Sequence, residues 1–90
     1  MIVDQITLEA AHKHSIFNRN EILQSELCGC FYCIKTFKPV EIVEWTDDEN
    51  PKGMTTVCPN CGIDSVIGNK SGYPINDENF LEAMHGHWFI

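Results

Sequence analysis

The chain has 90 residues, a formal net charge of −7 at pH 7 and a hydrophobic fraction of 43%. This apolar fraction excludes a wholly disordered chain, and no apolar run approaches the ~20 residues that span a bilayer. The length fits one domain over residues 1–90, close to the size at which a single hydrophobic core is barely sufficient, so a metal or a crosslink would add stability.

The pattern of basic residues argues against nucleic-acid binding, and the first segment of the chain argues against export. The six basic residues stand singly, without the basic stripe that would neutralise a nucleic-acid backbone, although a local patch could form in three dimensions. The first segment lacks the basic stretch and the sustained apolar core of a signal peptide, so we expect a cytoplasmic protein. Thiols stay reduced in the cytoplasm, and five cysteines there indicate a metal site more than disulfides.

Two helices are predicted before the first cysteine. Ile6 and Ala10 lie at helical spacing, which predicts a helix over residues 4–16. Asn18, followed three residues later by Glu21, has the side-chain pattern of a capping box with the asparagine as the cap. We expect the second helix to run from this cap to about the first cysteines.

The middle of the chain predicts a short helix, a loop and a hairpin. Pro39 fits the first turn of a helix, which we expect over residues 39–45. The polar residues 46–53 are expected to form the most exposed loop of the chain. The segments 55–58 and 63–68 flank the second cysteine pair and predict a β-hairpin built around it.

A last helix is predicted after a cap at Asp77 or Asn76. Its apolar residues fall at i, i+1, i+4, i+8 and i+9 and form one face: Phe80, Leu81, Met84, Trp88 and Phe89. The expected fold class is therefore a small α+β protein. Its metal-binding double knuckle and hairpin would be flanked by helices at the N-terminal and C-terminal ends.

Four of the five cysteines form two CxxC pairs. Cys30 and Cys33 make the first pair, and Cys58 and Cys61 make the second after an interval of 24 residues. Each CxxC turn aims both sulfurs at one point, so two turns supply a tetrahedral shell of four thiolates at ~2.3 Å from a metal. This soft shell suits zinc, or iron as the alternative, and excludes magnesium and calcium. Because the shell is closed, we expect one structural Zn²⁺ ion and no metal-based catalysis.

Cys28 is the fifth cysteine, and its role stays open. It could replace Cys30 as a ligand, although the tight CxxC turn would then be lost. Outside the metal shell it would be either a small buried hydrophobic residue or a reactive thiol beside the metal. No basic residue lies within five positions on either side, which favours packing over reactivity.

The two CxxC pairs and the glycine after the second pair resemble the zinc-ribbon and rubredoxin-like group of small metal modules. The resemblance covers about residues 28–68 and implies a metal held by both pairs. The predicted helices before, between and after the pairs depart from the usual ribbon. The whole chain, particularly CGCFYC, CPNCGIDSVIG, SGYPI and MHGHWF, is similar to small bacterial cytoplasmic proteins of unassigned function. That likeness implies a size and a compartment but no activity.

A few polar side chains could carry out catalysis. The candidates for a small hydrolase or nuclease are His12, His14, Asp64 and His85. His12 and His14 would face different ways on a helix, so packing and surface roles are favoured for them. One interpretation combines either histidine with Asn18 in a histidine–asparagine nuclease-like site, but the usual ββα order is missing and the acidic charge opposes DNA. Asp64 and Ser65 more readily hydrogen-bond the cysteine turn or the next loop than catalyse.

We therefore expect a zinc-stabilised domain that acts as a protein-binding or scaffolding module. Trp88 and Phe89 could close the core or form an apolar patch that meets a partner or a second copy of the chain. One alternative is the small hydrolase or nuclease, which a cleft gathering two histidines and Asp64 would support. The other is a rubredoxin-like iron electron carrier, which a red colour would indicate.

Overall fold

The computed structural model describes residues 4–89 and has three α-helices and five short strands in two antiparallel sheets. The helices are α1 (Gln5–His12), α2 (Arg19–Leu23) and α3 (Glu78–Trp88). The strands are β1 (Cys28–Cys30), β2 (Thr36–Phe37), β3 (Trp45–Thr46), β4 (Thr55–Thr56) and β5 (Val66–Gly68). The expected α+β class is confirmed. None of the helices between residues 4 and 89 is both long enough and apolar enough to cross a membrane.

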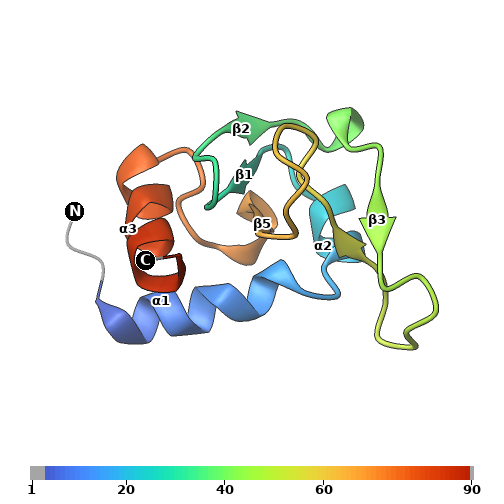
Figure 1. Ribbon diagram of the computed structural model, residues 1–90, viewed down its shortest axis with the longest axis horizontal. Helices are drawn as coiled ribbons and strands as arrows, with labels where there is room; N and C mark the ends of the chain where they lie inside the picture. The colour runs from blue at the N-terminus through green and yellow to red at the C-terminus, as the bar shows by residue number, and fades with distance from the viewer. Residues whose placement is uncertain (1–3, 90) are drawn as a thin grey trace.

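A three-stranded sheet with the order β2–β1–β5 occupies the centre of the molecule. Cys28 of β1 lies opposite Phe37 of β2, and Cys30 lies opposite Val66 of β5. β3 and β4 form a separate two-stranded sheet, at the end of the molecule opposite α3 (Figure 1). α1 runs along one side and packs against α3, so the two terminal helices cover the same end.

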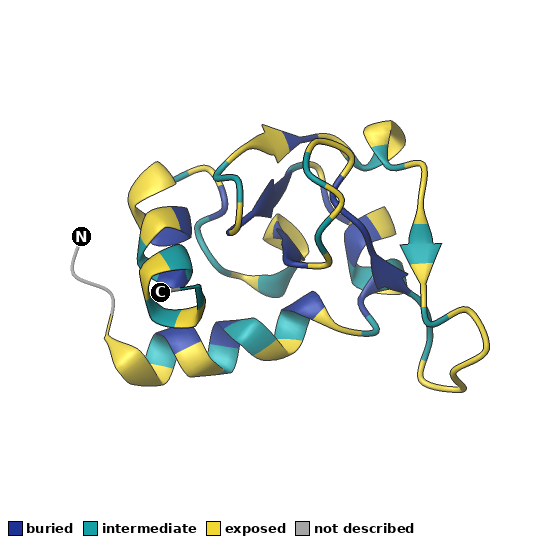
Figure 2. Ribbon diagram, viewed as in Figure 1, coloured by how far each residue is buried: buried dark blue, intermediate teal, exposed yellow. Residues whose placement is uncertain are grey.

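Two clusters of buried side chains fill the interior, and all five cysteines belong to the second or pack against it. The first cluster consists of Leu8, Ala11, Phe31, Ile67, Ile75, Phe80, Leu81 and Met84. The second consists of Ile22, Cys28, Cys30, Phe37, Cys58 and Val66, with Cys33 and Cys61 packed against it. Successive side chains of β5 point to opposite faces, so Val66 and Ile67 connect the two clusters. Figure 2 shows β1 and β5 as buried, and the loop between β3 and β4 as largely exposed.

The helix predicted over residues 4–16 is present. α1 is followed directly by a 3₁₀ turn over Lys13–Ser15. The Asp4 side chain caps α1 by accepting a hydrogen bond from the Thr7 N–H at 2.8 Å. The predicted cap of the last helix is also present, since the Asp77 side chain accepts from the Asn79 N–H at 2.9 Å.

The predicted capping box at Asn18 is wrong. Asn18 stands at the start of α2, but its side chain makes no capping hydrogen bond. Its Nδ2 instead donates to the carbonyls of His14 and Val66, each at 2.8 Å. Its Oδ1 accepts from the N–H of Thr56 at 3.1 Å and from the Thr56 hydroxyl at 3.0 Å. The amide thus joins the 3₁₀ turn after α1 to both sheets.

Two predicted helices are shorter than expected. α2 ends at Leu23, because the chain must be extended by Cys28 to pair with β2 and β5. Residues 39–45 form a single 3₁₀ turn, Pro39–Glu41, and then become extended. The β-branched residues that follow the turn fit extended backbone, and the pairing of β3 with β4 fixes it there.

The predicted β-hairpin around the second cysteine pair is wrong. β4 and β5, which flank Cys58 and Cys61, belong to different sheets because β4 pairs with β3 and β5 pairs with β1. The hairpin lies at the first pair instead, where β1 and β2 are consecutive antiparallel strands. The second cysteine turn therefore lies in a connection between the two sheets, as does the segment from β2 to β3.

Gly68 and Gly86 offer a pair of alanine substitutions with opposite expected effects. A Cβ on Gly68 would overlap the Ser25 hydroxyl and lie 2.9 Å from the Ser25 Cβ. Ser25 is held in place because its hydroxyl donates to the Glu21 carbonyl at 2.8 Å and accepts from the Lys70 N–H at 3.1 Å. We expect Gly68→Ala to lower the free energy of unfolding by about 1–3 kcal/mol through overpacking.

Gly86 is the matched control because it lies exposed in α3, where an added Cβ would meet nothing within 4 Å. Gly86→Ala should raise the free energy of unfolding by about 0.5–1 kcal/mol, the helix-propensity gain of alanine over glycine. Denaturant titration of both variants measures the two effects. Equal stability of Gly68→Ala and the wild type would disprove the tight contact between Ser25 and β5.

Candidate metal centre

The first CxxC turn, Cys30–Cys33, lies at the tip of the β1–β2 hairpin and is closed by its own backbone. The Cys30 N–H donates to the Lys35 carbonyl at 3.0 Å, and the Ile34 N–H donates to the Cys30 carbonyl at 2.9 Å. Inside the turn, the Tyr32 N–H donates to the Cys30 Sγ at 3.4 Å. An N–H directed at the sulfur stabilises a thiolate there. We call this turn the first knuckle.

The second CxxC turn, which we call the second knuckle, has the same geometry. The Cys58 N–H donates to the Ile63 carbonyl at 2.9 Å, and the Gly62 N–H donates to the Cys58 carbonyl at 3.0 Å. The Asn60 N–H donates to the Cys58 Sγ at 3.4 Å. Each of these donors and acceptors stands at the same offset from the leading cysteine as in the first knuckle. The two knuckles are therefore equivalent in backbone structure although their sequences differ.

The residue after the second cysteine of each knuckle has a left-handed backbone. Gly62 has a φ of 78°, and Ile34 at the equivalent place has a φ of 65°. Glycine adopts this conformation without steric penalty, whereas a β-branched residue is strained by about 1–3 kcal/mol. The Ile34 side chain packs against the first core cluster, and this burial offsets part of the strain.

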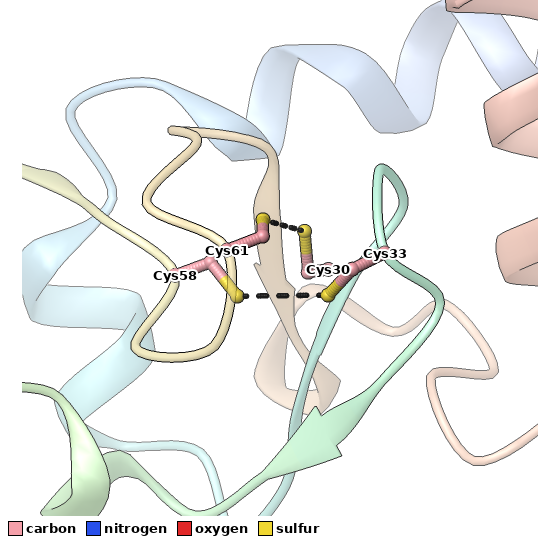
Figure 3. A group of neighbouring side chains, drawn as sticks. All are labelled: Cys30, Cys33, Cys58 and Cys61. Carbon is pink, nitrogen blue, oxygen red and sulfur yellow. Dashed lines mark hydrogen bonds between the residues drawn. The ribbon is translucent and has the colours of Figure 1, made fainter.

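The sulfurs of the two knuckles converge on one point (Figure 3). Cys30 Sγ and Cys61 Sγ are 3.6 Å apart, Cys33 Sγ and Cys58 Sγ are 3.8 Å apart, and all four lie within 4.8 Å of one another. The corners of a tetrahedron with metal–sulfur bonds of ~2.3 Å are about 3.8 Å apart. A disulfide would need ~2.05 Å, and all five cysteines are free thiols. The spacing thus fits a metal ion bound by four thiolates.

The thiols of the cluster differ in their affinity for protons. Burial raises the pKa of Cys30, but hydrogen bonds from Ser65 and from backbone N–H groups of the knuckle outweigh it and leave this pKa below its usual value. Burial raises the pKa of Cys58 and of Cys61, and the charge of the nearby Cys30 raises both further. The protein therefore favours the Cys30 thiolate, whereas thiolates at Cys58 and Cys61 would be favoured by a cation among the sulfurs.

Ser65 and Cys28 lie beside the cluster without belonging to it. The Ser65 hydroxyl is buried and lies 3.2 Å from the Cys30 Sγ, so it supports a ligand from outside the sulfur shell. Cys28 is 0% exposed and is absent from the group of four converging cysteines. Burial raises the pKa of Cys28 to about 12. An inaccessible, protonated thiol fits the packing role.

His12 and Asp64 line one cavity of about 110 Å³, with Ser15 and Ser65 also in its wall. The His12 ring packs against the Trp88 ring at a tilt of 35°, with centroids 4.0 Å apart. Burial lowers the pKa of His12, so its neutral form is favoured at neutral pH. The cavity thus brings Asp64 together with a single histidine.

The other catalytic candidates lie elsewhere. The His14 Nδ1 is 2.9 Å from a carboxylate oxygen of Glu21, and the His85 Nδ1 is 3.1 Å from the Phe31 carbonyl oxygen. The Asn18 amide is fully engaged with the fold, so a histidine–asparagine nuclease-like site is not formed. The expected cleft with two histidines and Asp64 is likewise not formed among the residues that line the cavity.

Trp88 and Phe89 connect the terminal helices to each other and to the first knuckle. The Trp88 Nε1 donates to the Leu8 carbonyl at 3.3 Å, although the residue stays 37% exposed. The Phe89 ring packs edge-on against Tyr32 of the first knuckle, with centroids 5.0 Å apart. Tyr32 itself is 44% exposed. Tyr32 and Trp88 thus each leave part of an aromatic ring exposed while the rest is tied into the fold.

What can be said of the cysteine cluster rests on its geometry and not on a similar protein. No protein-family model, no curated protein and no solved structure matches this chain. Four cysteines from two equivalent knuckles could hold a metal ion, and a set of four sulfurs suits zinc or iron. The cluster is compatible with a zinc-ribbon-like site, whereas the strand pairing around it differs from the expected hairpin.

Proposed function

We propose that the chain is a zinc-stabilised module in which Cys30, Cys33, Cys58 and Cys61 hold one structural ion. The observation that carries this proposal is the convergence of four sulfurs, from two equivalent knuckles, at tetrahedral spacing. The first knuckle belongs to the three-stranded sheet and the second connects that sheet to β4. The ion would therefore crosslink two sheets whose strands, of two or three residues each, are too short to be stable alone.

We further propose that the module binds another protein and does not catalyse a reaction at the metal. Four protein ligands fill a tetrahedral shell, which leaves no position for a substrate. Tyr32 lies in the first knuckle and packs against Phe89, so the metal would hold this exposed ring rigid, and Trp88 of α3 is exposed as well. Exposed tyrosine and tryptophan side chains are the residue types that dominate the centres of protein interfaces.

Elemental analysis of tag-free protein, combined with thiol counting, tests the metal proposal. We expect one zinc per chain, no reactive thiol in the native state, and five reactive thiols after unfolding with a chelator. One iron per chain, with thiolate-to-iron absorption, would favour an electron carrier over the zinc module. Protein without metal would overturn the proposal.

The cavity at His12 and Asp64 supports hydrolysis as a second candidate function, because it places a neutral imidazole with a carboxylate and two hydroxyls. A chromogenic acetate ester and a chromogenic phosphate ester, incubated with the zinc-loaded protein, test this candidate. Turnover that is lost in His12→Gln would favour the hydrolase over the binding module. Turnover no faster than in buffer alone would favour the binding module.

A further inference from the structure

A second cavity, of about 210 Å³, lies where the loop between β3 and β4 passes the start of α2. Its lining residues are Phe17, Arg19, Asn20, Lys52, Gly53 and Met54. None of them lines the cavity at His12 or belongs to the cysteine cluster. The volume is below the ~300–1,000 Å³ typical of pockets for drug-sized ligands, so a small ligand fits it.

Two of the six basic residues converge on this cavity, although Arg19 and Lys52 are far apart in the sequence. Within residues 4–89, neither cation lies within 4.0 Å of a carboxylate oxygen, since both ion pairs there involve histidines. The chain as a whole has 13 acidic residues against these six basic ones. Two cations without a carboxylate partner at one cavity favour a ligand that carries negative charge.

Arg19 is held in a fixed position by its neighbours. Its guanidinium lies over the Trp45 ring, 4.6 Å from the centroid, and one N–H donates to the Met54 Sδ at 3.1 Å. Its backbone N–H donates to the Met54 carbonyl at 3.1 Å. These contacts use one of the five guanidinium N–H donors, and the remaining ones have no hydrogen-bond acceptor among the described residues. The side chain is thus pre-positioned to donate to a ligand.

The loop between β3 and β4, which contacts Arg19 through Met54, also brings Lys52 to the cavity. The Lys52 Nζ lies 5.7 Å from the centroid of the Phe17 ring, which keeps the ammonium group near the cavity. The Phe17 N–H donates to the Thr55 hydroxyl oxygen at 2.9 Å, and that hydroxyl donates to Asp47 at 2.6 Å. The Asp47 carboxylate therefore helps to fix Phe17, and it lies more than 4.0 Å from both cations.

We propose that this cavity binds a small phosphate monoester. The phosphate group would accept hydrogen bonds from Arg19 and Lys52, and the apolar part of the ligand would lie against Phe17 and Met54. A phosphate monoester carries a charge of about −1.5 to −2 at pH 7, which matches two cations better than a singly charged carboxylate does. Binding here goes beyond the metal module and does not involve the cysteine cluster.

Titration of the full, metal-loaded chain with phenyl phosphate, followed by NMR of the backbone amides, tests the proposal. We expect saturable shifts at Arg19, Asn20 and Gly53. Arg19→Gln should weaken binding about tenfold, and Lys52→Gln about threefold because that ammonium is more exposed to solvent. Lys35→Gln is the matched control, since it removes the same charge from an exposed lysine outside the cavity and should leave the affinity unchanged.

A comparison ligand, benzoate, distinguishes a phosphate site from general attraction between the cavity and any anion. Benzoate, with the same ring and a single charge, should bind more weakly than phenyl phosphate, and added salt should weaken both. Absence of saturable shifts at millimolar phenyl phosphate would overturn the proposal, as would equal losses in Lys35→Gln and Lys52→Gln. Lys52→Gln keeps the test valid if Arg19→Gln fails to fold. Zinc content, measured on the same samples, shows separately whether the metal proposal holds.

Discussion

Cys58→Ser is expected to abolish metal binding and, with it, the folded structure. A structural zinc supplies an apparent ~10–16 kcal/mol, whereas a whole domain is stable by only about 5–15 kcal/mol. Serine keeps the size of the side chain but cannot provide the thiolate that the tetrahedral shell requires. We expect zinc content to fall from one ion per chain to near zero, and the cooperative thermal transition in circular dichroism to disappear.

Cys28→Ser is the matched control because it makes the same chemical change at an equally buried cysteine. Cys28 is 0% exposed and Cys58 is 2% exposed. The control should retain one zinc and lose only about 1–3 kcal/mol of stability, the penalty for burying a hydroxyl that lacks a partner. A folded, metal-free Cys58→Ser protein, or a Cys28→Ser protein that loses its zinc, would contradict the assignment of the four ligands.

Asn18→Ala is expected to lower the free energy of unfolding by about 3–5 kcal/mol. The residue is 4% exposed, and its amide makes hydrogen bonds to the backbone of His14, Val66 and Thr56 and to the Thr56 hydroxyl. Removal of the amide leaves buried backbone groups of three different elements without partners, each at a penalty of about 1–3 kcal/mol. Urea titration of the zinc-loaded variant measures the loss.

Asn20→Ala is the control for this change. Asn20 is exposed on α2, two residues further along the chain, and its substitution should change the stability by no more than about 0.5 kcal/mol. Asn18→Asp should destabilise at least as much as Asn18→Ala, because it turns a carboxylate oxygen toward the carbonyls of His14 and Val66. If Asn18→Ala is as stable as Asn20→Ala, the amide does not join the two sheets as described.

The convergence of Cys30, Cys33, Cys58 and Cys61 could be predicted from the sequence because each CxxC turn is a local structure. Only one long-range contact, the meeting of the two turns, is needed to complete the cluster. The pairing partners of β4 and β5 depend on many long-range contacts. The segments beside the second cysteine pair have the pattern of a hairpin, yet each finds its partner elsewhere in the chain. Hydrophobic alternation predicts a strand but does not identify its neighbour.

Asn18 and Arg19 show why the role of a single side chain is harder to predict from the sequence than the convergence of the cysteine pairs. Asparagine three residues before glutamate has the same spacing whether its amide caps a helix or lies buried between sheets. The tertiary structure decides between the two by placing Thr56 and Val66 beside it. Arg19 and Lys52 are isolated cations in the sequence, and only the path of the loop between β3 and β4 brings them to one cavity.

The left-handed residues at the ends of the two knuckles imply that the knuckles of the proposed metal centre form in sequence and not together. The second knuckle contains Pro59 and ends in Gly62, so its turn can form early and without strain, while the rest of the chain is still disordered. The first knuckle needs Ile34 in a conformation that is tolerated once its side chain is packed. An arriving ion would accordingly be captured by Cys58 and Cys61, and the hairpin would close over it as the hydrophobic core forms.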